Sequence, residues 1–206
     1  MKLFRTIETA AENGYKVGDV IGFTLNDGEE VEALAVKQED DGMIFYFVDA
    51  LKKEYRMNRT DSNRGGYKSC ELRKKLNGEI LDRFPAEIRE KMVAFDNGDF
   101  LRLATEREMF GENIYGEQED DSVQQWEPMK DRRNRIGFQG NKTGIWEWCW
   151  LQNKTEDYAA DFCLVGSSGN ANNYAALFCL VDSGGRADSG DASYATGVRP
   201  AFKITI

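Results

Sequence analysis

The chain has 206 residues, of which 41% are hydrophobic and 12% aromatic, so it can bury one core and does not require a second. Its formal net charge of −9 argues against a nucleic-acid or anionic-membrane partner, because both reward clustered Lys and Arg. No apolar run approaches the roughly 20 residues that span a bilayer, and residues 1–16 lack the continuous apolar core of a signal peptide. We expect one domain over residues 1–206, synthesised in the cytoplasm, with no membrane insertion and no nucleic-acid partner.

The cysteines and the absence of histidine limit the catalytic and metal-binding chemistry that the chain can perform. The four cysteines form no CxxC pair, which favours buried free thiols in a reducing compartment; they are Cys70, Cys149, Cys163 and Cys179. A disulfide between Cys163 and Cys179 stays open, because both occupy the same place in a short repeat described below. Without histidine the chain lacks the commonest general base at neutral pH and any His-based metal site. Composition therefore argues against catalysis.

The N-terminal third predicts an antiparallel meander over residues 1–60. Apolar runs at residues 18–25 and 31–36 flank an Asn-Asp-Gly turn, whose residues tolerate the positive φ angles of tight hairpins. A third run at residues 43–48 follows a second turn that ends in Gly42. Three consecutive strands joined by short turns are expected to pair in chain order.

Helices are predicted over residues 68–112. The first begins with Ser69 as its cap and carries apolar residues at helical spacing, namely Leu72, Leu76, Ile80, Leu81 and Phe84. Pro85 opens a second helix, where its missing N–H costs nothing, and Ile88 and Met92 mark the buried stripe.

A third short helix and two charged segments follow. Thr105 and Glu108 have the spacing of a capping box, in which each side chain bonds to the other residue's backbone. Residues 111–125 are polar and acidic and predict a long surface loop. The basic run at residues 130–135 is either a solvated face or an ion-pair partner for the acidic residues 119–121.

The C-terminal part, residues 144–206, is predicted to be rich in strands. Trp146, Trp148 and Trp150 fall at period two, on one face of a strand, which favours buried packing over an exposed stacking platform for a sugar or base. Two Phe-Cys-Leu-Val units, at residues 161–165 and 177–181, predict strands buried on both faces. A final strand covers residues 197–206, and its Pro200 predicts an edge position or a bulge.

Residues 157–202 differ in composition from the rest of the chain. They contain no Lys, Glu, Gln, Met or Trp and are rich in Ala, Gly, Ser, Asn, Asp and Tyr. That mixture is typical of antibody paratopes, where Tyr supplies contact area and small polar residues supply adaptable hydrogen bonds. Small residues also suit tight β-turns, and this alternative stays open. A disordered linker is disfavoured by the interleaved apolar strands.

The same region carries a resemblance to a known family. The Trp-Cys-Trp-Leu-Gln-Asn segment (148–153), the Phe-X-X-Val strands and the closing Gly-Val-Arg-Pro-Ala-Phe (197–202) resemble the variable proteins of diversity-generating retroelements. These proteins have a C-type-lectin-like fold and occur in phages and bacteria. Over most of its length the chain also resembles gut bacterial and phage proteins with this tail, through Leu-Arg-Lys (72–74), Leu-Arg-Leu (101–103) and Asp-Arg-Arg-Asn-Arg (131–135).

The resemblance implies a mechanism for the unusual composition. In that family an error-prone reverse transcriptase changes positions templated by adenine, and Lys, Glu, Gln, Met and Trp do not arise from the diversified codons. Diversified side chains would sit on a rigid lectin-like surface, with Trp148, Trp150 and residues 197–202 as invariant scaffold. The tandem Phe-Cys-Leu-Val unit departs from the family pattern and leaves open which of the two following loops is more exposed.

These observations predict an α+β, C-type-lectin-like fold with antiparallel sheets and two to three helices in its first half. The function we expect is binding of a protein or glycan on a target cell surface, as by a virion-associated phage or prophage receptor-binding protein. The predicted contact residues are the polar and aromatic side chains of the unusual segment: Tyr158, Asp161, Ser167, Ser168, Asn170, Asn172, Asn173, Tyr174, Asp182, Arg186, Asp188, Asp191, Ser193 and Tyr194.

Three alternatives remain beside this hypothesis. A non-diversified surface-binding or structural domain would have the same fold. An enzyme similar to the formylglycine-generating enzyme would need cysteine chemistry, but Cys163 and Cys179 lie in apolar runs, where a thiol is inert. A calcium-dependent lectin would need Glu-Pro-Asn or Trp-Asn-Asp signatures, and neither occurs, although Asp182, Asp188 and Asp191 offer some oxygen ligands. We therefore predict no catalytic residue, no metal and no cofactor.

Overall fold

A computed structural model of the chain describes residues 4–5, 14–140, 145–155, 177–181 and 184–205. Its larger sheet has seven strands in the order β1-β2-β3-β4-β14-β6, and β7 also pairs with β14. The strands are β1 (Phe4–Arg5), β2 (Val20–Thr24), β3 (Glu30–Glu39), β4 (Gly42–Phe47), β6 (Met92–Val93), β7 (Leu101–Arg102) and β14 (Ala201–Ile204). Among the described strands of this sheet, only β1 and β2 run parallel to each other. The predicted meander is confirmed as β2, β3 and β4. Gly28, with φ of 85°, supplies the positive angle at the first turn.

The final strand lies inside the large sheet, so the edge position, one of the two alternatives predicted from Pro200, was wrong; the other, a bulge, is not seen either, because the register of β14 with β4 has no shift from Ala201 to Ile204. On one side Ala201 pairs with Tyr46 of β4, and on the other side it pairs with Arg102 of β7. Pro200 stands one residue before the strand, and its carbonyl accepts a hydrogen bond from Phe47 N at 3.0 Å. The missing N–H of proline therefore falls outside the ladder, where it removes no bond.

The helices are short and cluster in the middle of the chain. They are α2 (Gly66–Ser69), α3 (Glu71–Lys75), the π-helical η1 (Leu76–Ile80), the 3-10 turn η2 (Leu81–Arg83), α4 (Ala86–Arg89), α5 (Glu106–Phe110), the 3-10 turn η3 (Glu127–Lys130) and α6 (Arg132–Arg135). None of the helices in the described ranges is long and apolar enough to cross a membrane.

Two helix predictions were wrong and one is confirmed. Cys70, not Ser69, caps α3, because its sulfur accepts from the backbone N–H of the third helical residue, while Ser69 ends α2. Met92 lies on β6, not on a helix, because the chain turns after α4 and pairs with β14. The capping box is confirmed: Thr105 Oγ1 accepts from Glu108 N at 3.2 Å, and Thr105 N donates to Glu108 Oε2 at 2.9 Å.

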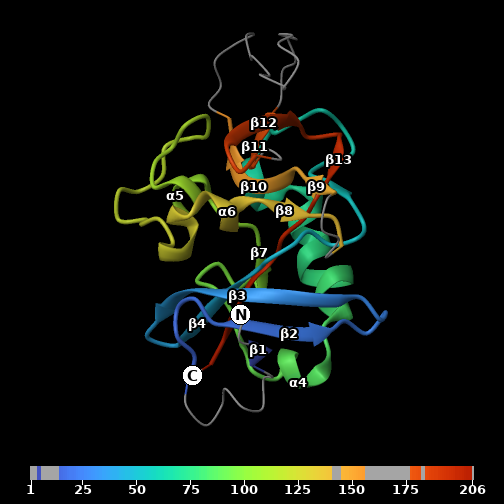
Figure 1. Cartoon of the computed structure of the whole chain (residues 1–206). Helices are drawn as coiled ribbons and strands as arrows, with labels where there is room; N and C mark the ends of the chain where they lie inside the picture. The colour runs from blue at the N-terminus through green and yellow to red at the C-terminus, as the bar shows by residue number, and fades with distance from the viewer. Residues whose placement is uncertain (1–3, 6–13, 141–144, 156–176, 182–183, 206) are drawn as a thin grey trace.

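A smaller antiparallel sheet lies at the opposite end of the molecule from the large one (Figure 1). It consists of β10 (Cys149–Lys154), β11 (Leu177–Val181) and β12 (Ala187–Asp191). Two short pairs join it to the rest, β8 (Gly137–Phe138) with β9 (Trp146–Glu147) and β13 (Ala195–Thr196) with β5 (Tyr55–Arg56). The predicted strand at residues 177–181 is confirmed as β11. The predicted strand at residues 161–165 lies outside the described residues.

The three tryptophans do not share one buried face. Trp150 is fully buried, and its indole N–H donates to Tyr55 O at 2.8 Å, so the packing prediction holds there. Trp148 is partly buried against the core, whereas Trp146 is 61% exposed. The prediction was wrong for Trp146 because the extended run breaks between β9 and β10 at Trp148.

Both faces of the large sheet are covered, which places one core on each side. Along β4, Phe45 and Phe47 face a cluster with the helices, while Ile44 and Tyr46 face a second cluster. The second cluster includes Trp126 and Leu151 of β10, so it joins the large sheet to the part that carries the smaller one. The molecule is therefore a mixed α and β structure built mainly of antiparallel strands, as the α+β prediction required.

Candidate functional site

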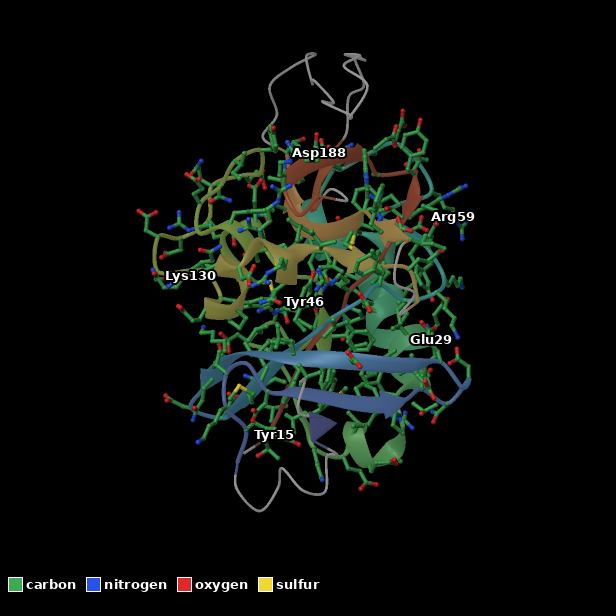
Figure 2. All side chains as sticks on the ribbon, in the orientation of Figure 1. Tyr15, Glu29, Tyr46, Arg59, Lys130 and Asp188 are labelled. Carbon is green, nitrogen blue, oxygen red and sulfur yellow. The ribbon has the colours of Figure 1, made fainter. Side chains whose placement is uncertain are left out.

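Most of the predicted contact residues lie outside the described ranges, and a smaller group lies within them. Those outside are Tyr158, Asp161, Ser167, Ser168, Asn170, Asn172, Asn173, Tyr174 and Asp182. Those described are Arg186, Asp188, Asp191, Ser193 and Tyr194. Figure 2 labels Asp188 on β12, in the smaller sheet.

Strand register decides which predicted contact residues belong together. Lys154 of β10 is the register partner of Phe178, and Leu177 is the partner of Asp191. The described flanks of residues 156–176 and the end of β12 thus lie at one end of the smaller sheet. Val181 is the partner of Ala187, so Arg186 lies at the opposite end of the same strands. Four strand steps separate the two ends, about 13 Å.

The end that contains Asp191 is formed by a tight turn. Asp191 Oδ1 accepts from the backbone N–H and the hydroxyl of Ser193, at 2.7 and 2.8 Å, and Tyr194 N donates to Asp191 O at 3.0 Å. A bond of 2.9 Å from Asn58 N to Ala192 O ties this turn to the body of the protein. Asp191 and Ser193 therefore shape the turn, while Tyr194, 64% exposed, is the side chain it presents.

The same end of β10 is flanked by the acidic loop predicted over residues 111–125. Glu106, fully buried on α5, accepts three backbone N–H bonds of 2.9 to 3.0 Å from residues 114–116 of this loop. Lys154 Nζ pairs with Glu117 at 2.8 Å, and Glu117 N donates to Lys154 O at 2.9 Å. The loop is thus fixed beside the flank of residues 156–176. In the sequence, the capping-box pattern around Glu106 predicted the helix α5. It did not predict that Glu106 would bond to the backbone of residues 114–116.

A polar cavity of about 320 Å³ lies between this loop, α2 and β10. Its lining includes Gly66, Lys68, Thr105, Glu117, Asn153 and Lys154. Asn153 is buried and bonds Glu106 N through its oxygen and Glu119 Oε2 through its nitrogen, at 2.7 and 2.9 Å. The cavity therefore has walls whose geometry is set by hydrogen bonds within the protein.

The opposite end of the smaller sheet contacts the basic run. Arg132 Nε donates to Gly184 O, and Arg135 Nε donates to Gly185 O at 3.0 Å. The acidic residues proposed as partners of this run bond elsewhere, since Asp121 pairs with Arg107 at 3.1 Å. Of the two predicted contact residues near this end, Arg186 is exposed to solvent, whereas Asp188 is buried, with 7% of its surface exposed.

The residues that the family resemblance marks as scaffold form one hydrogen-bonded unit. Gly197 N donates to Trp148 O at 2.8 Å, and Trp150 N donates to Gly197 O at 3.1 Å. Thr196 Oγ1 also donates to Trp148 O at 2.7 Å. A Cβ added at Gly197 would lie 2.5 Å from Glu147 Cγ and 2.6 Å from Trp148 O, so the position accepts only glycine without movement.

The cysteines that the structure describes are buried and unpaired. Burial raises the pKa of the Cys149 thiol to about 12 and also raises the pKa of the Cys70 thiol. Neither is a thiolate at neutral pH, and the thiolate is the nucleophile. Cys163 and the side chain of Cys179 lie outside the described residues. Within the described ranges, no three His, Cys, Asp or Glu side chains converge as metal ligands.

Comparison with known proteins gives one match. The model of a family described as a domain of unknown function, DUF6273, matches residues 41–206. The matched range starts directly before β4 and includes β14 and the whole smaller sheet. No curated protein and no solved structure matches the chain.

Proposed function

We propose that this chain, which belongs to the DUF6273 family, is a ligand-binding protein that presents residues 157–194 as a recognition surface on a fixed antiparallel scaffold. The observation that carries the proposal is the place in the fold at which the composition of the chain changes. The segment without Lys, Glu, Gln, Met or Trp starts three residues after the end of β10 and contains β11 and β12. Its composition changes just after β10, the first strand of the smaller sheet, and the other two strands of that sheet lie within the segment.

The scaffold has the properties that a variable surface requires. The flanks of residues 156–176 are held by an antiparallel ladder, and the buried carboxylate of Glu106 anchors the loop beside them; both sets of bonds are made to main-chain atoms. Such bonds do not depend on which side chain follows. The exposed ring of Tyr194 at the same end of the sheet offers amphipathic contact area at low entropic cost.

The finer identity is part of the same proposal. We assign the chain a C-type-lectin-like fold and the role of a variable protein of a diversity-generating retroelement, acting in phage or prophage receptor binding. Its partner is then a protein or glycan on a target cell surface. A non-diversified structural domain of the same fold would keep the scaffold and would not need an exposed recognition side chain at position 194.

Binding to whole bacterial cells tests the proposal. Fluorescently labelled protein is applied to a panel of gut bacterial strains, and affinity is measured by flow cytometry for parent, Tyr194→Ala and Arg186→Ala. Loss of an interfacial Tyr or Arg anchor typically weakens binding about tenfold or more. Phe100→Ala is the matched control, because Phe100 is an exposed aromatic residue (38%) beside β7, in the large sheet. Binding that falls equally in all three variants, or in none, contradicts the assignment.

A further inference from the structure

Two arginines of α6 bond to the main chain of the segment that leads into β12. Arg132 Nε donates to the carbonyl of Gly184, and Arg135 Nε donates to the carbonyl of Gly185 at 3.0 Å. Arg135 also donates to Met129 O at 3.1 Å. Every one of these acceptors is a main-chain oxygen.

A third arginine connects this contact to the core. Arg199 is 1% exposed, and its guanidinium donates to Phe47 O at 2.9 Å, to Arg135 O at 2.8 Å and to Asn134 O at 3.0 Å. Its guanidinium carbon lies 4.4 Å from the centre of the Tyr46 ring, which Figure 2 labels above the large sheet. Arg199 thus joins β4 of the large sheet to the main chain of α6.

The fit between α6 and the segment at residues 184–186 is close. Gly185 has a φ of 74°, and an added Cβ would lie 2.9 Å from Arg132 O and 3.0 Å from Ile136 Cγ1. Glycine is therefore required where the two segments meet. The next residue, Arg186, is exposed, whereas Asp188 and Ser189 further along β12 are buried.

We propose that Arg132 and Arg135, tied to the core by Arg199, are positioning residues that fix the start of β12 by its backbone, through bonds that do not depend on the side chains that follow. A carbonyl oxygen is the same in every residue, so this clamp is indifferent to sequence. The planar guanidinium supplies several fixed donors, which a lysine ammonium does not reproduce. The inference rests on the proposed recognition function for its purpose, but the clamp itself is a property of the unliganded protein.

A binding site for an anion or a nucleic acid is the competing explanation for a basic run, and the geometry disfavours it. Arg133 pairs with Asp131 at 2.6 Å, and Lys130 pairs with Glu127 at 2.5 Å. The guanidinium donors of Arg135 are directed at carbonyls, and its carbon lies 5.1 Å from the Phe110 ring centre. The net charge of −9 adds no attraction for an anion.

Amide hydrogen exchange of the unliganded protein, read by mass spectrometry, tests the clamp. Arg132 is exposed, so Arg132→Lys is not expected to disturb the core, and Arg133→Lys is its matched control on the same helix, with a side chain that is 87% exposed. Loss of one hydrogen bond to the backbone is expected to speed exchange of amides 184–191 about five- to tenfold in Arg132→Lys. Exchange in β3 and β4 should not change, and Arg133→Lys should match the parent throughout.

A second series tests indifference to sequence. Arg186→Ala, Arg186→Asp and Arg186→Tyr are expected to leave exchange of β12 amides within about twofold of the parent while Arg132 is present. The clamp is overturned if Arg132→Lys and Arg133→Lys exchange alike, or if the Arg186 variants change β12 exchange as much as Arg132→Lys does. Because these exchange experiments use no ligand, a negative result does not contradict the binding proposal. Conversely, a protein that binds no cell can still show the exchange pattern expected of the clamp.

Discussion

Replacing Gly197 with alanine probes the unit that the resemblance marks as invariant. The added Cβ would lie 2.5 Å from Glu147 Cγ, 2.6 Å from Trp148 O and 3.0 Å from Ala50 Cβ. Trp148 O is a backbone atom and Ala50 Cβ is bonded directly to the backbone, so neither can move away by a side-chain rotation. Relief requires a backbone shift, which would lengthen the bonds from Gly197 N to Trp148 O and from Trp150 N to Gly197 O.

The expected cost follows from these two effects. Overpacking a filled site typically costs about 1–3 kcal/mol, and each weakened buried backbone bond adds roughly 1 kcal/mol. We therefore expect a loss of about 3 kcal/mol in the free energy of unfolding, which corresponds to a fall in Tm of about 6–12 °C for a chain of this size. Urea and thermal unfolding followed by circular dichroism measure it.

Gly78→Ala is the control for this substitution. Gly78 lies in the helical segment η1, and no atom lies within 4 Å of an added Cβ. Because alanine favours helix over glycine, this variant should be unchanged or more stable by up to about 1 kcal/mol. If Gly197→Ala unfolds at the same urea concentration as Gly78→Ala, the argument that residue 197 is sterically fixed is refuted.

Two further predictions concern ionisable groups near the scaffold. Burial and a neighbouring carboxylate raise the pKa of Glu147, so the stability that its neutral form provides is present at low pH and is lost as pH rises through the folded-state pKa. Glu147→Gln keeps the side chain neutral, and its urea midpoint relative to the parent should be higher at pH 7 than at pH 3; a difference independent of pH would contradict this. Cys70 and Cys149, buried with raised pKa values, should resist iodoacetamide in the native protein and react in urea, as mapped by peptide mass spectrometry. Fast native labelling of either thiol would support the enzyme alternative.

Local patterns in the sequence predicted the elements that depend on local interactions. The Asn-Asp-Gly hairpin and the capping box at Thr105 formed as expected, because turn and cap residues bond within a few positions. The position of β14 was not predictable in the same way. Pro200 removes one backbone donor at its own position, and the strands that pair with β14 come from distant parts of the chain. Cys70 displaced Ser69 as a cap because α2 ends there, a boundary that apolar spacing does not mark.

For the candidate site, composition identified the segment but not its geometry. Arg186 and Tyr194 are eight positions apart, and both lie among small polar residues. The register of β11 with β12 nevertheless places them at opposite ends of the sheet. The arginines of α6 were predicted as a solvated or ion-paired face, because a sequence does not reveal that a cation will bond to a carbonyl some 50 positions away. Such contacts depend on the tertiary fold alone.

The central claim is that residues 157–194 vary on a constant scaffold, and sequencing this gene from many members of one population tests it most directly. We predict that substitutions cluster in that segment at positions templated by adenine. The codons for Trp150, Gly197 and Arg199 should stay constant, because these residues hold the scaffold through buried main-chain bonds. Substitutions scattered evenly along the gene, without a preference for adenine, would contradict the account.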